Sequence, residues 1–157
     1  MTGTHQDKAS VAAAVLLERL IRDTYTARHS SEIQPLQWSI LRYLARTPED
    51  QRQLRRSATF LNLTPSPVAR AIITLAQRGL VTQSISKVDS RIKTITLTRL
   101  GLEALEQDPI VAVASRIEAL PERERQDFIR SVRTLALDTA HHPKPVDEDG
   151  GNTDTSR

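Results

Sequence analysis

The fold is decided by residues 54–79, which read LRRSATFLNLTPSPVARAIITLAQRG. The spacing of apolar residues predicts two short helices joined by a tight turn, with the second helix at about residues 65–78. Asn62 lies in that turn, and asparagine is one of the few residues other than glycine that adopts a positive φ at low cost. Pro65 in the first helical turn and Gly79 just after the last one mark the ends of the second helix. The segment therefore predicts a helix-turn-helix.

The packing between the two predicted helices follows from the residue sizes near the turn. Helices that cross at a steep angle need a small residue at their closest approach, and Ala58 provides one. Leu63 and Val68 are expected to fill the gap between the helices. Thr64 is expected to cap the N-terminus of the second helix with its hydroxyl group.

The second helix is expected to present a polar face to its surroundings. At 100° per residue, Val68 and Leu75 point inward, so a second set of side chains points outward. The outward residues are Ser66, Arg70, Ile73, Thr74 and Gln77. Short hydroxyl side chains near the N-terminus and an arginine one turn later suit a helix whose N-terminal end enters the major groove of DNA. A plain helical hairpin with a solvated face is the alternative interpretation.

A β-hairpin is predicted directly after the second helix. Residues 80–86 and 92–98 are rich in β-branched side chains and alternate apolar with polar. The tip between them carries Lys87 and Arg91, and Lys93 follows. A cationic hairpin at this position is a wing, which lies along phosphates or enters a minor groove. An exposed hairpin with ordinary surface lysines is the alternative.

Positive charge is concentrated in the middle of the chain. Residues 50–100 carry nine basic and two acidic side chains, a net +7, whereas the remainder carries thirteen basic and seventeen acidic ones. A polyanion that docks on the middle third is the direct physical interpretation. The candidate DNA-contacting residues are Arg55, Arg56, Thr64, Ser66, Arg70, Thr74, Gln77, Lys87, Arg91 and Lys93.

The flanks of this segment are predicted to be helical. Apolar periodicity indicates one helix at residues 8–28 and another at 36–45. After the hairpin, helical pattern returns at residues 98–119, with a bend expected near Pro109, and Pro121 begins a last helix. The predicted fold class is therefore mainly α with a small β-hairpin wing, that is, a winged helix-turn-helix with additional helices.

Several stretches resemble the MarR family of bacterial transcription regulators. The pattern is Leu-x-x-x-Gly-Leu-Val ending at Val81, then Asp-x-Arg ending at Arg91, then Leu-Thr-x-x-Gly ending at Gly101. The resemblance covers about residues 10–138. Three positions depart from the family: Ser90 replaces a second wing arginine, Pro67 removes a backbone N–H, and Ile73 is apolar.

The resemblance implies a homodimeric repressor that binds double-stranded DNA at a pseudo-palindromic operator. It implies that Arg70 and the residues around Ser66 read bases or phosphates, and that Arg91 serves the wing. It also implies release by a small aromatic or phenolic effector, for which Trp38 and Tyr43 are candidate pocket residues with core packing as the alternative. The implied organisation is a disordered N-terminus at 1–7, a dimerisation helix and linker at 8–34, a DNA-binding lobe at 35–99, dimerisation helices at 100–140 and a disordered tail at 141–157.

The inventory of chemical groups argues against catalysis. The chain has no cysteine, its four histidines are scattered, and its five glycines form no phosphate-binding loop. We therefore expect no enzyme activity, no metal and no cofactor. No apolar stretch is long enough to span a bilayer, so we expect no membrane partner and a cytoplasmic location.

Two other functions fit the same fold. One is a winged-helix module that binds protein without specific DNA binding, and the other is a regulator that has lost effector sensing. The basic middle segment favours DNA over a protein adaptor, because an adaptor would not need that charge.

Overall fold

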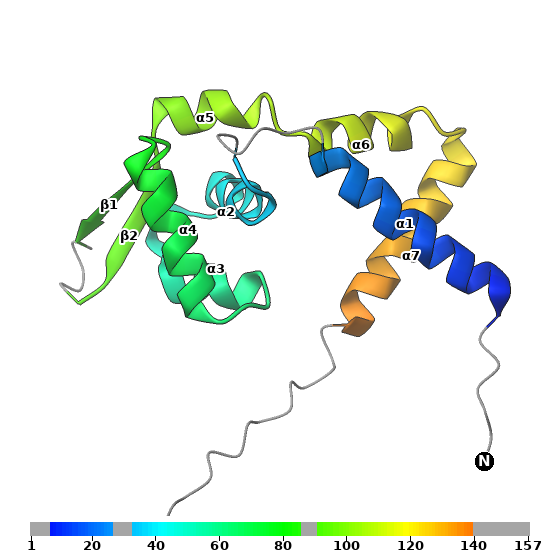
Figure 1. Ribbon diagram of the computed structural model, residues 1–157, viewed down its shortest axis with the longest axis horizontal. Helices are drawn as coiled ribbons and strands as arrows, with labels where there is room; N and C mark the ends of the chain where they lie inside the picture. Colours follow the sequence, from blue (N-terminus) through cyan, green and yellow to red (C-terminus); the bar gives the residue numbers. More distant parts are fainter. Residues whose placement is uncertain (1–6, 27–32, 86–90, 140–157) are drawn as a thin grey trace, which may run out of the picture. The chain divides into compact units, whose positions relative to one another are not determined.

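The computed structural model describes residues 7–26, 33–85 and 91–139. The chain divides into two compact units, residues 1–114 and 115–157, and we describe each by itself. The elements, shown in Figure 1, are α1 (Lys8–Thr26), α2 (Pro35–Arg46), the 3-10 turn η1 (Glu49–Gln51), α3 (Leu54–Phe60), α4 (Pro65–Gln77), β1 (Val81–Ile85), β2 (Lys93–Leu97), α5 (Arg99–Leu105), α6 (Ile110–Glu118) and α7 (Glu122–Thr139). The predicted fold class is confirmed, and η1 is an element that the sequence did not predict.

Helix α2 lies at the centre of the first unit. It begins at Pro35, whose fixed φ suits a first helical turn, and the backbone N–H of Gln34 donates to Oε1 of Gln37 at 2.9 Å. Its apolar face is completely buried at Ile40, Leu41 and Leu44. Helices α3 and α4 and the hairpin pack around this helix, which gives the lobe one shared hydrophobic core.

The turn between α3 and α4 has the geometry predicted for Asn62, whose φ is 52°. Ala58 and Val68 are buried between the helices, as expected. Leu63, however, is 39% exposed, so the prediction that it fills the gap is wrong. Its backbone N–H donates to the Ala58 carbonyl at 3.0 Å, which makes Leu63 part of the turn at the surface. Leu61 packs against the core in its place.

Thr64 occupies the N-cap position of α4 in an extended conformation, but its side chain makes no capping hydrogen bond. A capping hydroxyl accepts from the backbone N–H of the second or third helical residue. The third residue of α4 is Pro67, which has no N–H. The predicted N-cap position of Thr64 is confirmed, but no hydroxyl hydrogen bond accompanies it, and Pro67 removes one of the two possible donors. The other end of α4 is as predicted, with Gly79 at φ 72°.

The hairpin pairs β1 with β2 in antiparallel register, with Val81 opposite Leu97. It is also tied to the segment between η1 and α3, because the backbone N–H of Ile95 donates to the Arg52 carbonyl at 2.8 Å. The two predicted strands are confirmed to within about a residue at each end. The wing tip, with Lys87 and Ser90, lies outside the described residues.

The helix predicted at 98–119 is in fact two helices, because α5 ends at Leu105 and α6 begins at Ile110. Asp108 lies in the break and is only 4% exposed. Its Oδ1 accepts from the backbone N–H of Ile110 at 3.0 Å, which caps α6. Pro109 has no backbone N–H to continue the first helix, and Asp108 supplies an acceptor that caps a new one. The chain therefore forms two separate helices here instead of one bent helix.

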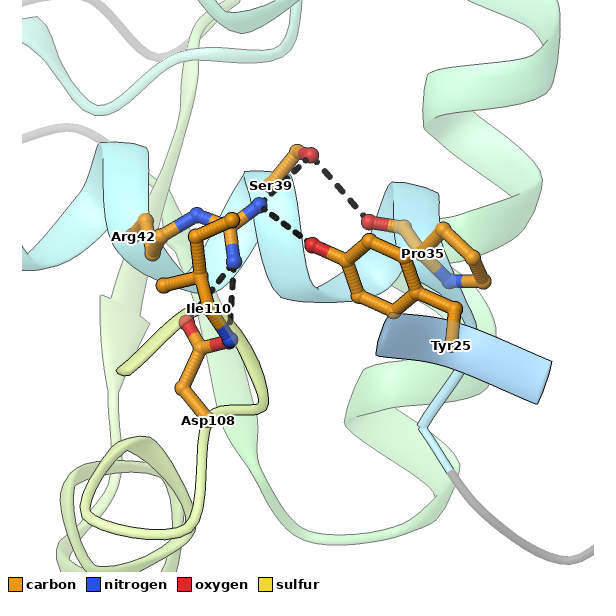
Figure 2. A network of polar contacts seen from close by, with 6 residues as sticks. All are labelled: Tyr25, Pro35, Ser39, Arg42, Asp108 and Ile110. Carbon is orange, nitrogen blue, oxygen red and sulfur yellow. Dashed lines mark hydrogen bonds and ion pairs between the residues drawn. The ribbon is translucent and has the colours of Figure 1, made fainter. Parts of the chain in front are cut away.

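Asp108 also receives the guanidinium of Arg42, as Figure 2 shows. Nη1 of Arg42 lies 2.7 Å from Oδ2 of Asp108, while Nη2 donates to Ser39 Oγ at 3.1 Å and to the Tyr25 hydroxyl at 3.4 Å. Burial by itself lowers the pKa of Arg42, but the hydrogen bonds to Asp108 and Tyr25 and the charge of Asp108 raise it above its ordinary value. The network joins α1, α2 and the start of α6 around a permanent positive charge.

Apolar side chains are exposed on helices of both units. In α1 of the first unit they are Val11, Val15, Leu16, Leu17 and Ile21, and in α7 of the second unit they are Ile129, Val132, Leu135 and Leu137. None of the described helices is both long and apolar enough to cross a membrane.

The terminal stretches predicted to be disordered, 1–7 and 141–157, lie outside the described residues apart from Asp7. The Asp7 carboxylate accepts hydrogen bonds from the backbone N–H groups of Ala9 and Ser10, each at 3.3 Å, and so caps α1.

Candidate nucleic-acid interface

The outward face of α4 has the composition predicted from the sequence. The side chains of Val68, Ala71, Ile72 and Leu75 are buried, which fixes the rotation of the helix. All five residues predicted to face outward are exposed: Ser66, Arg70, Ile73, Thr74 and Gln77. This helix therefore presents hydroxyl, guanidinium and amide groups on one side and holds its other side in the core.

Arg70 and Thr74 on this face differ in which of their polar groups remain available to a ligand. Arg70 forms no ion pair with any described residue, so its guanidinium is available. The Thr74 hydroxyl donates to the Arg70 carbonyl at 3.1 Å, so its proton is committed and its oxygen is left as an acceptor. A free guanidinium on an exposed helix face can make the bidentate contact by which arginine reads a guanine edge.

The base of the wing forms a hollow of about 540 Å³, which we call the wing hollow. Its basic lining residues are Arg55 from α3 together with Arg91 and Lys93 from the hairpin. The amides of Gln53 and Gln83 also line it, and no carboxylate is among its described lining residues. The hydrogen bond from Ile95 to Arg52 holds the hairpin against the segment between η1 and α3. Three cations gathered in one hollow create a positive potential that attracts an anion such as a phosphate.

A second hollow, of about 940 Å³, lies between α2, η1 and α3, and we call it the α2–α3 hollow. Its arginines are Arg42, Arg46, Arg55 and Arg56, and its aromatic residues are Tyr43 and Phe60. Arg55 thus lines both hollows.

The two candidate effector residues lie in different surroundings. Tyr43 lines the α2–α3 hollow, and its hydroxyl donates to the Gln51 carbonyl at 3.2 Å. Trp38 is 5% exposed within the core of the lobe and is not part of the lining of that hollow. The structure does not bring the two side chains together in one described hollow.

The positions of the ten candidate DNA-contacting residues are as follows. Four lie on the outward face of α4, Thr64 is exposed at its N-cap, and Arg55 and Arg56 are exposed on α3. Arg91 and Lys93 are exposed on the hairpin, and Lys87 lies outside the described residues. The sequence analysis missed Gln53 and Gln83 at the wing hollow, because only the pairing of the hairpin with α3 brings them there. Within the described ranges, no group of His, Asp or Glu side chains has the arrangement of a metal site.

Comparison with known proteins gives two findings. Residues 33–101 match the family model of the winged helix DNA-binding domain. Among proteins with curated functions, no match was found.

Solved structures with the same fold include several bacterial regulators. The S. aureus MepR–DNA complex is 18% identical, with 85% of this chain and 99% of that chain covered and a TM-score of 0.67. PcaV, a transcriptional regulator from Streptomyces coelicolor in complex with its natural ligand, is 21% identical, with 88% and 99% covered and a TM-score of 0.65. CouR from Rhodococcus jostii, bound to p-coumaroyl-CoA, is 19% identical, with 88% and 95% covered and a TM-score of 0.69. The expectation drawn from the family resemblance is confirmed for the fold.

Proposed function

Because residues 33–101 match the family model of the winged helix DNA-binding domain, within a chain that has the fold of MarR-family regulators, we propose that this protein is a sequence-specific transcriptional regulator. The observation that carries the proposal is the pairing of two features in one lobe. Helix α4 exposes Arg70, which forms no ion pair with a described residue, beside hydroxyl and amide groups, and the described lining of the wing hollow brings three cations together.

In the proposed complex, the N-terminal half of α4 enters the major groove. Arg70 reads a base edge, and Thr64, Ser66, Thr74 and Gln77 contact bases or phosphates from the same face. Arg55, Arg56, Arg91 and Lys93 neutralise phosphates on either side of the groove, and Lys87 extends that contact along the wing. Ile73, 51% exposed, is placed to touch a thymine methyl group.

We further propose that the protein acts as a homodimer. A second copy of the chain would bury the exposed apolar residues of α1 and, separately, those of α7. These helices lie within residues 8–34 and 100–140, which the sequence analysis expected to form the dimer. Two lobes related by a two-fold axis would bind a pseudo-palindrome with half-sites about one helical turn apart.

We propose that the protein is a repressor and that a small aromatic or phenolic molecule releases it from DNA. The printed descriptions of PcaV and CouR as ligand-bound proteins support an effector, and Trp38 and Tyr43 remain our candidates for its contacts. This function is binding alone and requires no catalysis. The proposed location is the cytoplasm, where bacterial DNA lies.

Replacing Arg70 with alanine is expected to weaken operator binding by about 1–3 kcal/mol while leaving binding to unrelated duplex nearly unchanged, because a base-reading contact is lost. The measurement is fluorescence anisotropy with an operator selected from genomic fragments and with a scrambled duplex of equal length.

Two further variants distinguish a contact that reads a base from a contact that depends on charge alone. Arg91→Ala is expected to weaken binding to both duplexes alike, since a wing contact to phosphate carries no sequence information. Arg99→Ala should alter neither affinity, because Arg99 is exposed on α5 and paired with Glu103. If Arg70→Ala keeps the parent's ratio of operator to scrambled affinity, Arg70 does not read bases.

A further inference from the structure

The α2–α3 hollow has chemistry that the DNA-binding proposal does not use. Its described lining residues all lie between Ser39 and Leu61, and none of them belongs to α1 or α5. It therefore differs in place from an effector site between the lobe and the dimerisation helices. Its volume of about 940 Å³ is large enough for a molecule the size of a nucleotide.

Three of the four hydroxyl groups that line this hollow, those of Ser39, Tyr43 and Thr59, already donate within the protein. Ser39 Oγ donates to the Pro35 carbonyl at 3.1 Å, Tyr43 to the Gln51 carbonyl at 3.2 Å, and Thr59 Oγ1 to the Arg55 carbonyl at 3.0 Å. The Arg42 guanidinium is held by Asp108.

The charged donors of the hollow that remain uncommitted are guanidinium groups, beside the Thr47 hydroxyl and the Gln51 amide. Arg46, Arg55 and Arg56 form no ion pair within the described part of the chain, and no Asp or Glu lines the hollow. Three unpaired guanidinium groups around one hollow repel one another. A ligand with several negative charges and many acceptors removes that repulsion and satisfies the donors, whereas a cation or a donor-rich ligand does neither.

Tyr43 and Phe60 give the same hollow an aromatic surface. The Phe60 ring packs on Tyr43 with centroids 4.9 Å apart and an angle of 41° between the rings, and Phe60 is still 68% exposed. Tyr43 is fixed from below by its hydrogen bond to Gln51. Phe60 therefore offers a supported, open ring on which a planar group can stack.

We propose that the α2–α3 hollow binds a phosphate-bearing planar molecule of the nucleotide class. The ring of the ligand stacks on Phe60, and its phosphates accept hydrogen bonds from Arg46 and Arg56 with Arg55 nearby. A single carboxylate would leave most of the guanidinium charge uncompensated, and this favours two or three phosphate charges over an aromatic monoacid.

One regulatory consequence rests on the proposed function. Arg55 and Arg56 are also our candidate phosphate contacts for DNA, so a bound nucleotide neutralises charge that the duplex needs. Occupancy should weaken DNA binding, and by linkage DNA should weaken nucleotide binding by the same factor.

Isothermal titration calorimetry with ADP, in the absence of DNA, tests the site directly. Adenosine supplies the ring without charge, pyrophosphate the charge without the ring, and naphthalene-2-carboxylate a ring with one charge. We expect ADP to bind the full-length protein more tightly than any of these three. We expect Arg46→Gln to weaken ADP by about tenfold, the loss of one charge-assisted hydrogen bond. Phe60→Leu should weaken ADP and leave pyrophosphate unchanged.

The matched control is Arg99→Gln, which removes an exposed arginine far along the chain from the hollow and should bind ADP like the parent. Circular dichroism melting curves check that each variant is folded. Equal ADP affinity for Arg46→Gln and the parent would overturn the proposal, as would naphthalene-2-carboxylate binding more tightly than ADP. Absence of ADP binding would also overturn the proposal, and DNA binding would then be the one proposed role of these arginines.

The DNA consequence is measured separately by adding ADP to the anisotropy titration, where a weaker duplex affinity is expected. An unchanged duplex affinity would remove only the regulatory consequence. A protein that binds ADP but no duplex would contradict the proposed function and leave the nucleotide site standing.

Discussion

Gly101→Ala is expected to lower the free energy of unfolding by about 3 kcal/mol, the upper part of the range for forcing extra volume into packed structure. A Cβ atom at this position would lie 2.1 Å from the Leu80 carbonyl oxygen and 3.1 Å from Cδ2 of Leu97. The backbone at Leu80 cannot easily move away, because its carbonyl accepts the Thr98 N–H at 3.1 Å. Thr98 in turn donates its hydroxyl to the Gly79 carbonyl at 2.6 Å.

This junction joins the end of α4, the start of β1 and the start of α5, so the loss should appear as a lower urea midpoint by circular dichroism. Gly79→Ala is the matched comparison. Its Cβ would meet nothing closer than 3.9 Å, and only its φ of 72° is unfavourable, which costs about 1 kcal/mol. If Gly101→Ala were as stable as Gly79→Ala or more so, the close approach of α5 to Leu80 would be contradicted.

Asp108→Ala is expected to lower the free energy of unfolding by about 2 kcal/mol. Breaking a buried ion pair by removing one partner costs about 3–5 kcal/mol, and the partial exposure of the Arg42 side chain, 23%, reduces that. Asp108→Asn should lose less, because its side-chain oxygen can still accept from the Ile110 N–H and cap α6. Urea unfolding measures both variants.

The double variant Arg42→Met/Asp108→Ala is the control for the pairing. Removing both charges leaves no buried cation unpaired, so it should recover part of the stability lost by Asp108→Ala. Losses that add fully in the double variant would show that Arg42 and Asp108 act independently.

The sequence predicted the features that depend on local periodicity and backbone preference. Most of the helices, the two strands, the positive φ of Asn62 and the terminator Gly79 are as expected, because each follows from a few adjacent residues. The exposed face of α4, with Arg70 at its centre, follows from helical periodicity once Val68 and Leu75 are taken to point inward.

Features that depend on two elements meeting were not predictable in the same way. Arg42 and Asp108 are 66 residues apart, and nothing local to either residue indicates the pair. The wing hollow exists because β2 hydrogen-bonds to Arg52, just before α3, which brings Arg55 and Lys93 to one hollow. The uncapped Thr64 was predictable in part, since a proline three residues later removes one of the two donors that its hydroxyl could use.

The central claim is that α4 and the wing present exposed positive charge to duplex DNA, and its most direct test is the salt dependence of binding. We would measure the dissociation constant of the parent protein for a mixed-sequence duplex between about 50 and 200 mM salt. At about −0.9 for each phosphate neutralised, Arg55, Arg56, Arg91 and Lys93 predict a slope of about −3.6 for one lobe and about −7 for the proposed dimer, when the logarithm of the association constant is plotted against the logarithm of the salt concentration. A slope near zero, or no binding to duplex even at the lowest salt, would contradict the account.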